Sequence, residues 1–388
     1  MQLSSRSKVW VGIFLALLLA GACAYVYQLI NGLGVTGMSN GVSWGAYITC
    51  FMFFVGLSAG GLIVASSAHV FGIESFKKIA LPAVITSTAC ICCAGVCIFL
   101  DLGGIQRIWR MIVGLNITSP LAWDMIVITI YLIINILDIV WLKKGEEEKV
   151  KKLSFVALPV AILVHSVTAW IFGLEIAKEG WYSAILAPIF VASALDSGMA
   201  LLLTVLFGLK KTNIMDCGED LFASLAKLLA TFIAVDAYLI GCELLTVAYP
   251  GTEAGNELLT IMTSGATAPF FWAEIIIGLL IPFCVLVSKK RRYNSACVVG
   301  ASICVMLGVL CKRIWLLFSS FSMANIYGAP GISSGSTAAR AEAGTESWAL
   351  LGSYTPTPVE IVIVLAVFSA CALMIVFLSK KLIGKDNQ

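Results

Sequence analysis

Residues 359–378 read VEIVIVLAVFSACALMIVFL, a run of 20 residues dominated by apolar side chains. An α-helix rises about 1.5 Å per residue, so a run of this length can cross the ~30 Å hydrocarbon core of a bilayer. Residues 126–137, IVITIYLIINIL, form a second apolar run. A membrane β-barrel would instead show segments of about ten residues with alternating polarity. The two runs therefore predict an all-α polytopic membrane protein.

The composition of the whole chain supports this prediction. Of 388 residues, 60% are apolar and 12% are charged, whereas soluble domains have about 25% charged residues. The mean hydropathy is +0.98. These values exclude a soluble globular enzyme, a disordered chain and a nucleic-acid-binding protein. The net charge of +3 indicates no acidic or basic partner.

Ten transmembrane helices are expected along the chain. The predicted spans are 9–30, 44–71, 79–100, 120–142, 153–175, 183–208, 222–248, 268–288, 296–318 and 359–382. We divide the chain into an extra N-terminal helix with its outer loop (1–43), a core (44–318), a long loop rich in Gly, Ser, Thr and Ala (319–358), and a C-terminal helix with its tail (359–388).

The lysines and arginines predict the orientation. One alternating set of connecting segments and termini holds 18 of them, and the opposite set holds four: Arg107, Arg110, Lys178 and Arg340. Because positive residues favour the cytoplasmic side, we expect a multi-pass protein of the cytoplasmic membrane with both termini in the cytoplasm. The first span could be a signal peptide, but its apolar run continues through Ile30, which favours a retained helix.

Ionisable residues inside the spans are candidate functional groups, because each costs roughly 2.5–3.5 kcal/mol to insert at the bilayer centre. Counting along the spans places three near the midplane: His165, Asp196 and Asp236. Seven fall near the outer surface: Asp101, Asp124, Glu175, Glu243, Glu274, Lys312 and Arg313. This distribution predicts a polar cavity that opens from the outer face and reaches the midplane.

Each of these residues also has a structural interpretation. His165 could bond a backbone carbonyl inside the bundle, and Asp196 and Asp236 could make interhelical hydrogen bonds. Lys312 and Arg313 are expected to extend along the helix toward the interface. The only two histidines, His69 and His165, lie at different depths, so a haem with two histidine ligands is not expected. We also expect no metal or nucleotide site in this chain.

Several motifs occur in an order and spacing that suggest a family. They are D101-LGGIQ-R107-IW, N116-ITSPLAW, W44 followed by G56-LSAGG, H165-SVTAW, G180-WYS, A187-PIF, S193-ALDSG and F271-WAE. Together they cover about residues 44–318 and resemble the NrfD/PsrC family, the membrane subunits of polysulfide reductase and related respiratory complexes. Gly104 and Ile105 stand where many members have Arg-Pro.

The resemblance implies a core of two four-helix bundles, here with one extra helix at each end. It implies a quinone-reactive membrane protein that exchanges electrons with an iron–sulfur subunit, which has four clusters and docks on the outer face. A molybdopterin catalytic subunit would lie above that subunit. Menaquinone is the quinone expected of an anaerobic respiratory complex, and the iron–sulfur clusters and molybdopterin are expected only in the partners.

Site residues follow as hypotheses. His165 and Asp196 would accept protons from quinol, because histidine and buried carboxylates titrate in a suitable range. Relay groups would be Asp236, Glu243 and Glu274. Asp101 and Arg107 would order the outer loop, and further quinone contacts would come from Trp109, Trp123, Trp170 and Glu175. A secondary transporter with intramembrane carboxylates and a structural anchor without quinone chemistry stay open as alternatives. The direction of electron flow, the terminal substrate and proton translocation are not determined by the sequence.

Overall fold

The computed structural model describes residues 5–39, 41–323 and 353–384, and all regular secondary structure in these ranges is helical. Within them, ten helices are long and apolar enough to cross a membrane. They are α1 (Ser5–Asn31), α2 (Ala46–Val70), α3 (Glu74–Asp101), α5 (Pro120–Lys144), α6 (Glu147–Gly173), α7 (Leu186–Lys211), α8 (Glu219–Ala248), the consecutive segments α10 (Ala268–Ala273), η3 (Glu274–Leu280) and α11 (Ile281–Val287), α13 (Ser295–Phe321), and α14 (Pro358–Leu382). The chain is therefore a multi-pass membrane protein, as predicted.

Short helices lie between the long ones. They are η1 (Leu33–Val35), η2 (Ile105–Arg107), α4 (Arg110–Val113), α9 (Glu253–Thr263) and α12 (Lys289–Arg292). The expected loop at 319–358 lies mostly outside the described residues.

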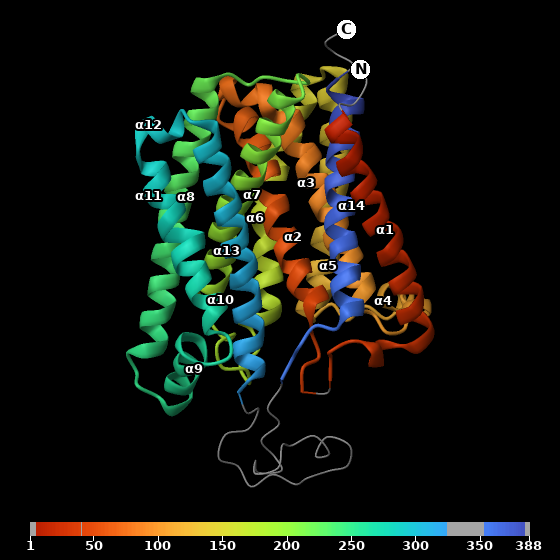
Figure 1. Cartoon of the computed structure of the whole chain (residues 1–388), viewed down its shortest axis with the longest axis vertical. Helices are drawn as coiled ribbons and strands as arrows, with labels where there is room; N and C mark the ends of the chain where they lie inside the picture. The colour runs from red at the N-terminus through yellow and green to blue at the C-terminus, as the bar shows by residue number, and fades with distance from the viewer. Residues whose placement is uncertain (1–4, 40, 324–352, 385–388) are drawn as a thin grey trace.

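The long helices pack as two four-helix bundles. The first bundle consists of α2, α3, α5 and α6, and the second of α7, α8, the α10–η3–α11 segment and α13. Helix α2 contacts α7 and joins the bundles, while α1 pairs with α14, which packs on α3 at the edge of the molecule (Figure 1). This arrangement is the predicted core with one extra helix at each end.

The two ends of the molecule differ in charge. Pairs of lysines lie at one end of the molecule, the end at which α1 begins and α14 ends. These pairs are Lys77 and Lys78, Lys143 and Lys144, Lys210 and Lys211, Lys289 and Lys290, and Lys380 and Lys381. We call this the lysine-rich end; it is at the top of Figure 1. The opposite end, which carries α4 and α9, is the lysine-poor end.

Two helices begin earlier than the hydropathy pattern predicts. Helix α3 starts at Glu74 rather than near 79, and α6 starts at Glu147 rather than near 153. Acidic residues in a first turn interact favourably with the positive end of the helix dipole, so a charged turn can extend an apolar helix into the interface. As a result, Pro159 lies inside α6.

A glycine contact fixes the seam between the bundles. A Cβ atom placed on Gly60 of α2 would lie 2.5 Å from the Cα of Gly198 of α7. Only two glycines allow backbones to approach this closely, and small residues at such contacts are typical of membrane helix pairs. The seam places Ser197 of α7 against α2, where its Oγ would lie 3.6 Å from a Cβ on Gly56.

Candidate functional site

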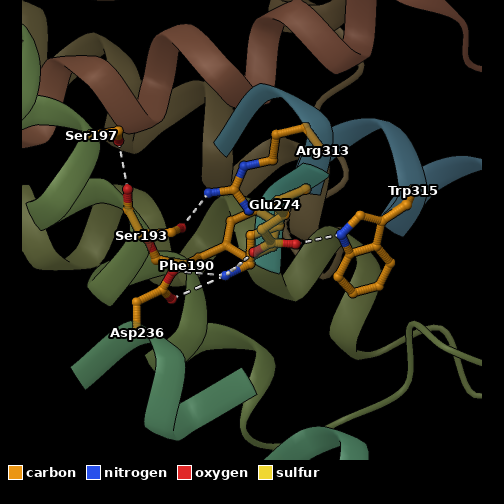
Figure 2. Close-up of polar contacts among 8 residues, drawn as sticks. Phe190, Ser193, Ser197, Asp236, Glu274, Arg313 and Trp315 are labelled. Carbon is orange, nitrogen blue, oxygen red and sulfur yellow. Dashed lines mark hydrogen bonds and ion pairs between the residues drawn. The ribbon is translucent and has the colours of Figure 1, made fainter. Parts of the chain in front are cut away.

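A buried ion-pair cluster lies inside the second bundle. Lys312 Nζ of α13 lies 3.0 and 3.1 Å from the two carboxylate oxygens of Asp236 on α8. It lies 3.5 Å from Glu274 Oε1. Trp315 Nε1 donates a hydrogen bond of 2.5 Å to the other oxygen of Glu274 (Figure 2). The Lys312, Asp236 and Glu274 side chains are at most 2% exposed, so these charged groups interact with one another away from solvent.

Local sequence explains how the helices present these groups. Lys312 and Trp315 are three residues apart on α13 and therefore lie on one face. Glu274 begins the π-helical segment η3, which ends just before Pro282. Proline lacks an N–H group and its ring clashes with the carbonyl four residues earlier. The wider π turn accommodates this clash, and such turns are frequent at functional sites.

Arg313 lies next to Lys312 in sequence but faces the seam between the bundles. Its Nη2 donates a 2.6 Å hydrogen bond to Ser193 Oγ, and its guanidinium lies 3.8 Å from the ring centre of Phe190. A Cβ placed on Gly56 of α2 would lie 3.9 Å from the same Nη2. The remaining guanidinium nitrogens, Nε and Nη1, have no hydrogen-bond partner in the described part of the chain.

The expected placement of Lys312 and Arg313 was wrong. Hydropathy predicts that both side chains extend to the interface, yet their exposed fractions are 2% and 1%. Lys312 lies nine residues before the end of α13, a distance of about 14 Å along the axis. Carboxylates from neighbouring helices at that depth compensate its charge, which hydropathy along one helix does not reveal.

Asp196 and His165 are both fully buried but do not bond each other. Neither carboxylate oxygen of Asp196 on α7 has a hydrogen-bond partner among the described residues, and the same holds for His165 Nε2 on α6. Asp196 interacts electrostatically with Asp236, Lys312 and Glu274, whereas His165 does so with Arg313. The structure thus groups Asp196 with the ion-pair cluster and places His165 on the other bundle.

The cluster contains more acidic than basic groups. Three carboxyl groups (Asp196, Asp236 and Glu274) face two cations, Lys312 and Arg313. Like charges that share a buried site disfavour full ionisation. The excess of carboxyl groups makes them candidates for proton exchange.

A narrow apolar recess opens beside the cluster at the lysine-poor end. Glu243 stands on its wall and accepts a 2.8 Å hydrogen bond from Ser183 Oγ. The Lys312 and Trp315 side chains also line the recess, so it reaches the ion-pair cluster. Its apolar lining comes from Leu186, Ile189, Ile240, Leu244, Val247, Leu258, Leu259, Met262 and Leu316. Mostly apolar pockets with a few converging polar groups are typical binding sites for small molecules.

The remaining predicted residues lie at the lysine-poor end outside the cluster. Arg107, Trp109 and Glu175 are exposed, while Asp101 is half-buried at the end of α3. The half-buried Trp123 donates a 2.6 Å hydrogen bond to the Ile117 carbonyl, and Trp170 is half-buried on α6. None of these side chains is hydrogen-bonded or ion-paired to the cluster residues within the ranges described.

Lys178 lies at the same end, between α6 and α7, and stacks over the rings of Trp181 and Phe321. Burial against these rings lowers its pKa. Proximity to aromatic faces favours the charged form, so the two effects act in opposite directions on this lysine.

Sequence reasoning missed two features of the site. Trp315 was not selected, although its spacing from Lys312 places both on one helical face. The π-helical start at Glu274 was also not predicted. Pro282 within an apolar run was the only available signal for it.

Comparisons with known proteins agree with the motifs. A family model described as "Polysulphide reductase, NrfD" matches residues 34–324. The chain belongs to the NrfD family. The matched range contains both four-helix bundles and every residue of the ion-pair cluster, so the resemblance inferred from the motifs is confirmed.

Individual relatives of this NrfD-family chain are named as subunits of reductases or oxidoreductases. It is 34% identical to a putative dimethyl sulfoxide reductase membrane subunit of Halobacterium salinarum, over 94% of this chain and 89% of the relative. It is 28% identical to an Hdr-like menaquinol oxidoreductase integral membrane subunit of Archaeoglobus fulgidus, over 78% of each. A selenate reductase subunit of Mesobacillus selenatarsenatis is 26% identical, over 80% of this chain and 81% of the relative.

Proposed function

We propose that this chain exchanges electrons between the quinone pool, with menaquinone as its substrate, and an iron–sulfur subunit docked at the lysine-poor end. That subunit would serve a molybdopterin catalytic subunit. The names of the relatives support a membrane subunit of a reductase complex, and one of them names menaquinol. The positive-inside rule supports a lysine-rich end that faces the cytoplasm.

The observation that carries this proposal is the position of Lys312. Its ammonium group belongs to the buried ion-pair cluster, and its side chain also lines the apolar recess. A quinone has an apolar tail and a ring with two carbonyl oxygens. The recess has the apolar lining that a quinone tail and ring require. Lys312 can donate a hydrogen bond to a carbonyl oxygen. Trp315 provides an aromatic wall beside it.

Proton exchange with quinone requires groups that can change their protonation state. Quinol oxidation releases two electrons and two protons, and quinone reduction takes up the same number. Asp196 lies in the cluster with an excess of carboxyl groups, and its oxygens have no protein partner in the described residues. His165 presents a similarly unpartnered Nε2 from the first bundle, again among the residues described. We assign both residues to proton exchange, with Asp236, Glu243 and Glu274 as neighbouring relay groups.

Substitution of His165 tests this assignment. In the purified complex, His165→Ala should abolish quinol-driven turnover while the iron–sulfur partner stays bound. His69→Ala is the matched control, because His69 is also buried but lies near the lysine-rich end and bonds the Ala65 carbonyl. Turnover near the wild-type rate in His165→Ala would refute the assignment. Loss of the partner together with turnover would favour a structural anchor, and a wild-type chain without any redox partner would favour a transporter.

A further inference from the structure

Four consecutive basic residues form the short helix α12 at the lysine-rich end. They are Lys289, Lys290, Arg291 and Arg292, and they follow Ser288, whose extended backbone ends α11. The first three are exposed and Arg292 is half-buried. Figure 1 shows α12 at the outer edge of the second bundle. We call these four residues the α12 basic cluster.

The α12 basic cluster has no counterion in the part of the chain that the structure describes. None of its four residues forms an ion pair with a carboxylate there. Other lysines at the same end do: Lys77 Nζ lies 2.7 Å from Glu74 Oε1, and Lys210 Nζ lies 3.4 Å from Asp216 Oδ2. Four positive charges within about one helical turn therefore attract anions from outside the chain.

The length of the preceding span places the α12 basic cluster at the depth of lipid headgroups. The α10–η3–α11 segment covers 20 residues, Ala268–Val287, and is the shortest of the ten candidate spans found among the described residues. At about 1.5 Å per residue it measures ~30 Å, which is the thickness of the hydrocarbon core. Because α12 begins at Lys289, directly after this span, its charged groups lie where the phosphate groups of the bilayer begin.

An exposed apolar stripe continues from the α12 basic cluster toward the bilayer centre. Phe283 and Val287 are four residues apart on α11 and share a face, and Leu280 precedes Phe283 by three residues. Their exposed fractions are 56% for Leu280, 36% for Phe283 and 55% for Val287. A ligand that contacts both the cations and this stripe needs an anionic group and an apolar chain. This combination favours a lipid over a soluble acidic partner.

Arg292 and Tyr293 also line a recess beside the ends of α7 and α8. The recess contains two acidic residues, Asp216 and Glu219, but Lys210 Nζ lies 3.4 and 4.0 Å from their carboxylates. Arg292 has no such partner in the ranges described, so its guanidinium is available to an added anion. An arginine can hold a phosphate through two parallel hydrogen bonds, which gives the α12 basic cluster a defined anchor.

We propose that the α12 basic cluster binds an anionic phospholipid with two phosphate groups, in the leaflet at the lysine-rich end. Arg292 binds one phosphate, Lys289 and Lys290 bind the other, and the acyl chains lie on the apolar stripe. Four cations match two phosphates better than one. Basic pockets between membrane helices on the cytoplasmic side are typical of binding sites for such lipids. The site lies at the end opposite the quinone recess, and the inference does not depend on quinone exchange.

Native mass spectrometry of the delipidated full-length chain, titrated with defined lipids, tests the proposal. Cardiolipin, with two phosphates, should bind more tightly than phosphatidylglycerol, with one, and much more tightly than zwitterionic phosphatidylcholine. Each basic residue at an anionic surface contributes about fivefold in affinity, so Lys289→Gln/Lys290→Gln should weaken cardiolipin binding roughly 30-fold. The matched control is Lys380→Gln/Lys381→Gln, which removes the same charge at the same end and should bind cardiolipin as the wild type does.

Two further measurements separate a lipid site from loss of folding and from general charge. Lys289→Arg/Lys290→Arg keeps both charges and should retain cardiolipin binding. Cardiolipin with a photoreactive acyl chain should label residues 276–287. Equal losses of affinity in Lys289→Gln/Lys290→Gln and its control, or cardiolipin binding no tighter than that of either other lipid, would overturn the proposal. Displacement of cardiolipin by an equal concentration of inorganic phosphate would also overturn it, because the site would then bind free anions.

Discussion

Lys312 is the residue on which the buried cluster depends. It neutralises Asp236 and approaches Glu274, and all three side chains are removed from solvent. A buried ion pair adds little net stability compared with well-packed apolar residues, because both charges must be desolvated. The positive charge at this position nevertheless matters, since loss of the cation leaves carboxylates without compensation.

Removal of this ammonium group should destabilise the protein strongly. Lys312→Met is expected to lower the free energy of unfolding by about 3–5 kcal/mol, the usual cost of breaking a buried pair from one side. Denaturant titration of the purified chain in detergent measures this change. Lys227→Met on α8 is the control, because Lys227 is exposed. If Lys312→Met and Lys227→Met were equally stable, Lys312 would not compensate buried carboxylate charges.

The ionisable residues of the cluster could be selected from the sequence, but their relative depths and their partners could not. The sequence correctly singled out His165, Asp196, Asp236 and Glu274 as ionisable groups within apolar spans. It could not show that Asp196 joins the cluster while His165 lies apart, because pairing depends on helix rotation and neighbour order. Lys312 was misplaced for the same reason, since one helix alone gives no information about carboxylates on its neighbours.

At the scale of helices, the seam between α2 and α7 is set by Gly60 and Gly198. Their backbones approach so closely that a Cβ on Gly198 would lie 2.4 Å from the Gly60 nitrogen. The seam matters for the site because Asp196 and Ser193 lie on the same helix, within two turns of Gly198.

A side chain at this seam should force the bundles apart. Gly198→Val is expected to lower the free energy of unfolding by about 1–3 kcal/mol, the usual cost of overpacking. Gly208→Val on the same helix is a matched control, because its Cβ would meet no atom within 4 Å. Thermal unfolding of both variants measures the difference. If Gly198→Val were as stable as Gly208→Val, the conclusion that α2 and α7 are in close contact at Gly198 would be wrong.

Helix positions followed from hydropathy, whereas irregular features did not. Ten apolar runs predicted ten membrane helices because each must satisfy its own backbone hydrogen bonds in lipid. The early starts of α3 and α6 arise from charged turns, and the π segment at Glu274 arises from Pro282. Hydropathy averages over such local effects, so their positions require the structure.

At the scale of the whole molecule, the two four-helix bundles differ in the polar groups that they bury. The second bundle contains the ion-pair cluster and the recess at the lysine-poor end, and the first contains the buried His165 on α6. Membership of the NrfD family and the reductase subunits among its relatives indicate that such a chain works within a complex.

The most direct test of the central claim is mild-detergent purification of the tagged chain from its native membranes, followed by addition of a menaquinol analogue. Iron and molybdenum analysis and low-temperature paramagnetic resonance then detect the partners. The account predicts iron and molybdenum in the purified complex and cluster signals that appear when quinol is added. A chain that purifies alone, without metal and without a quinol-dependent signal under anaerobic extraction, would contradict it.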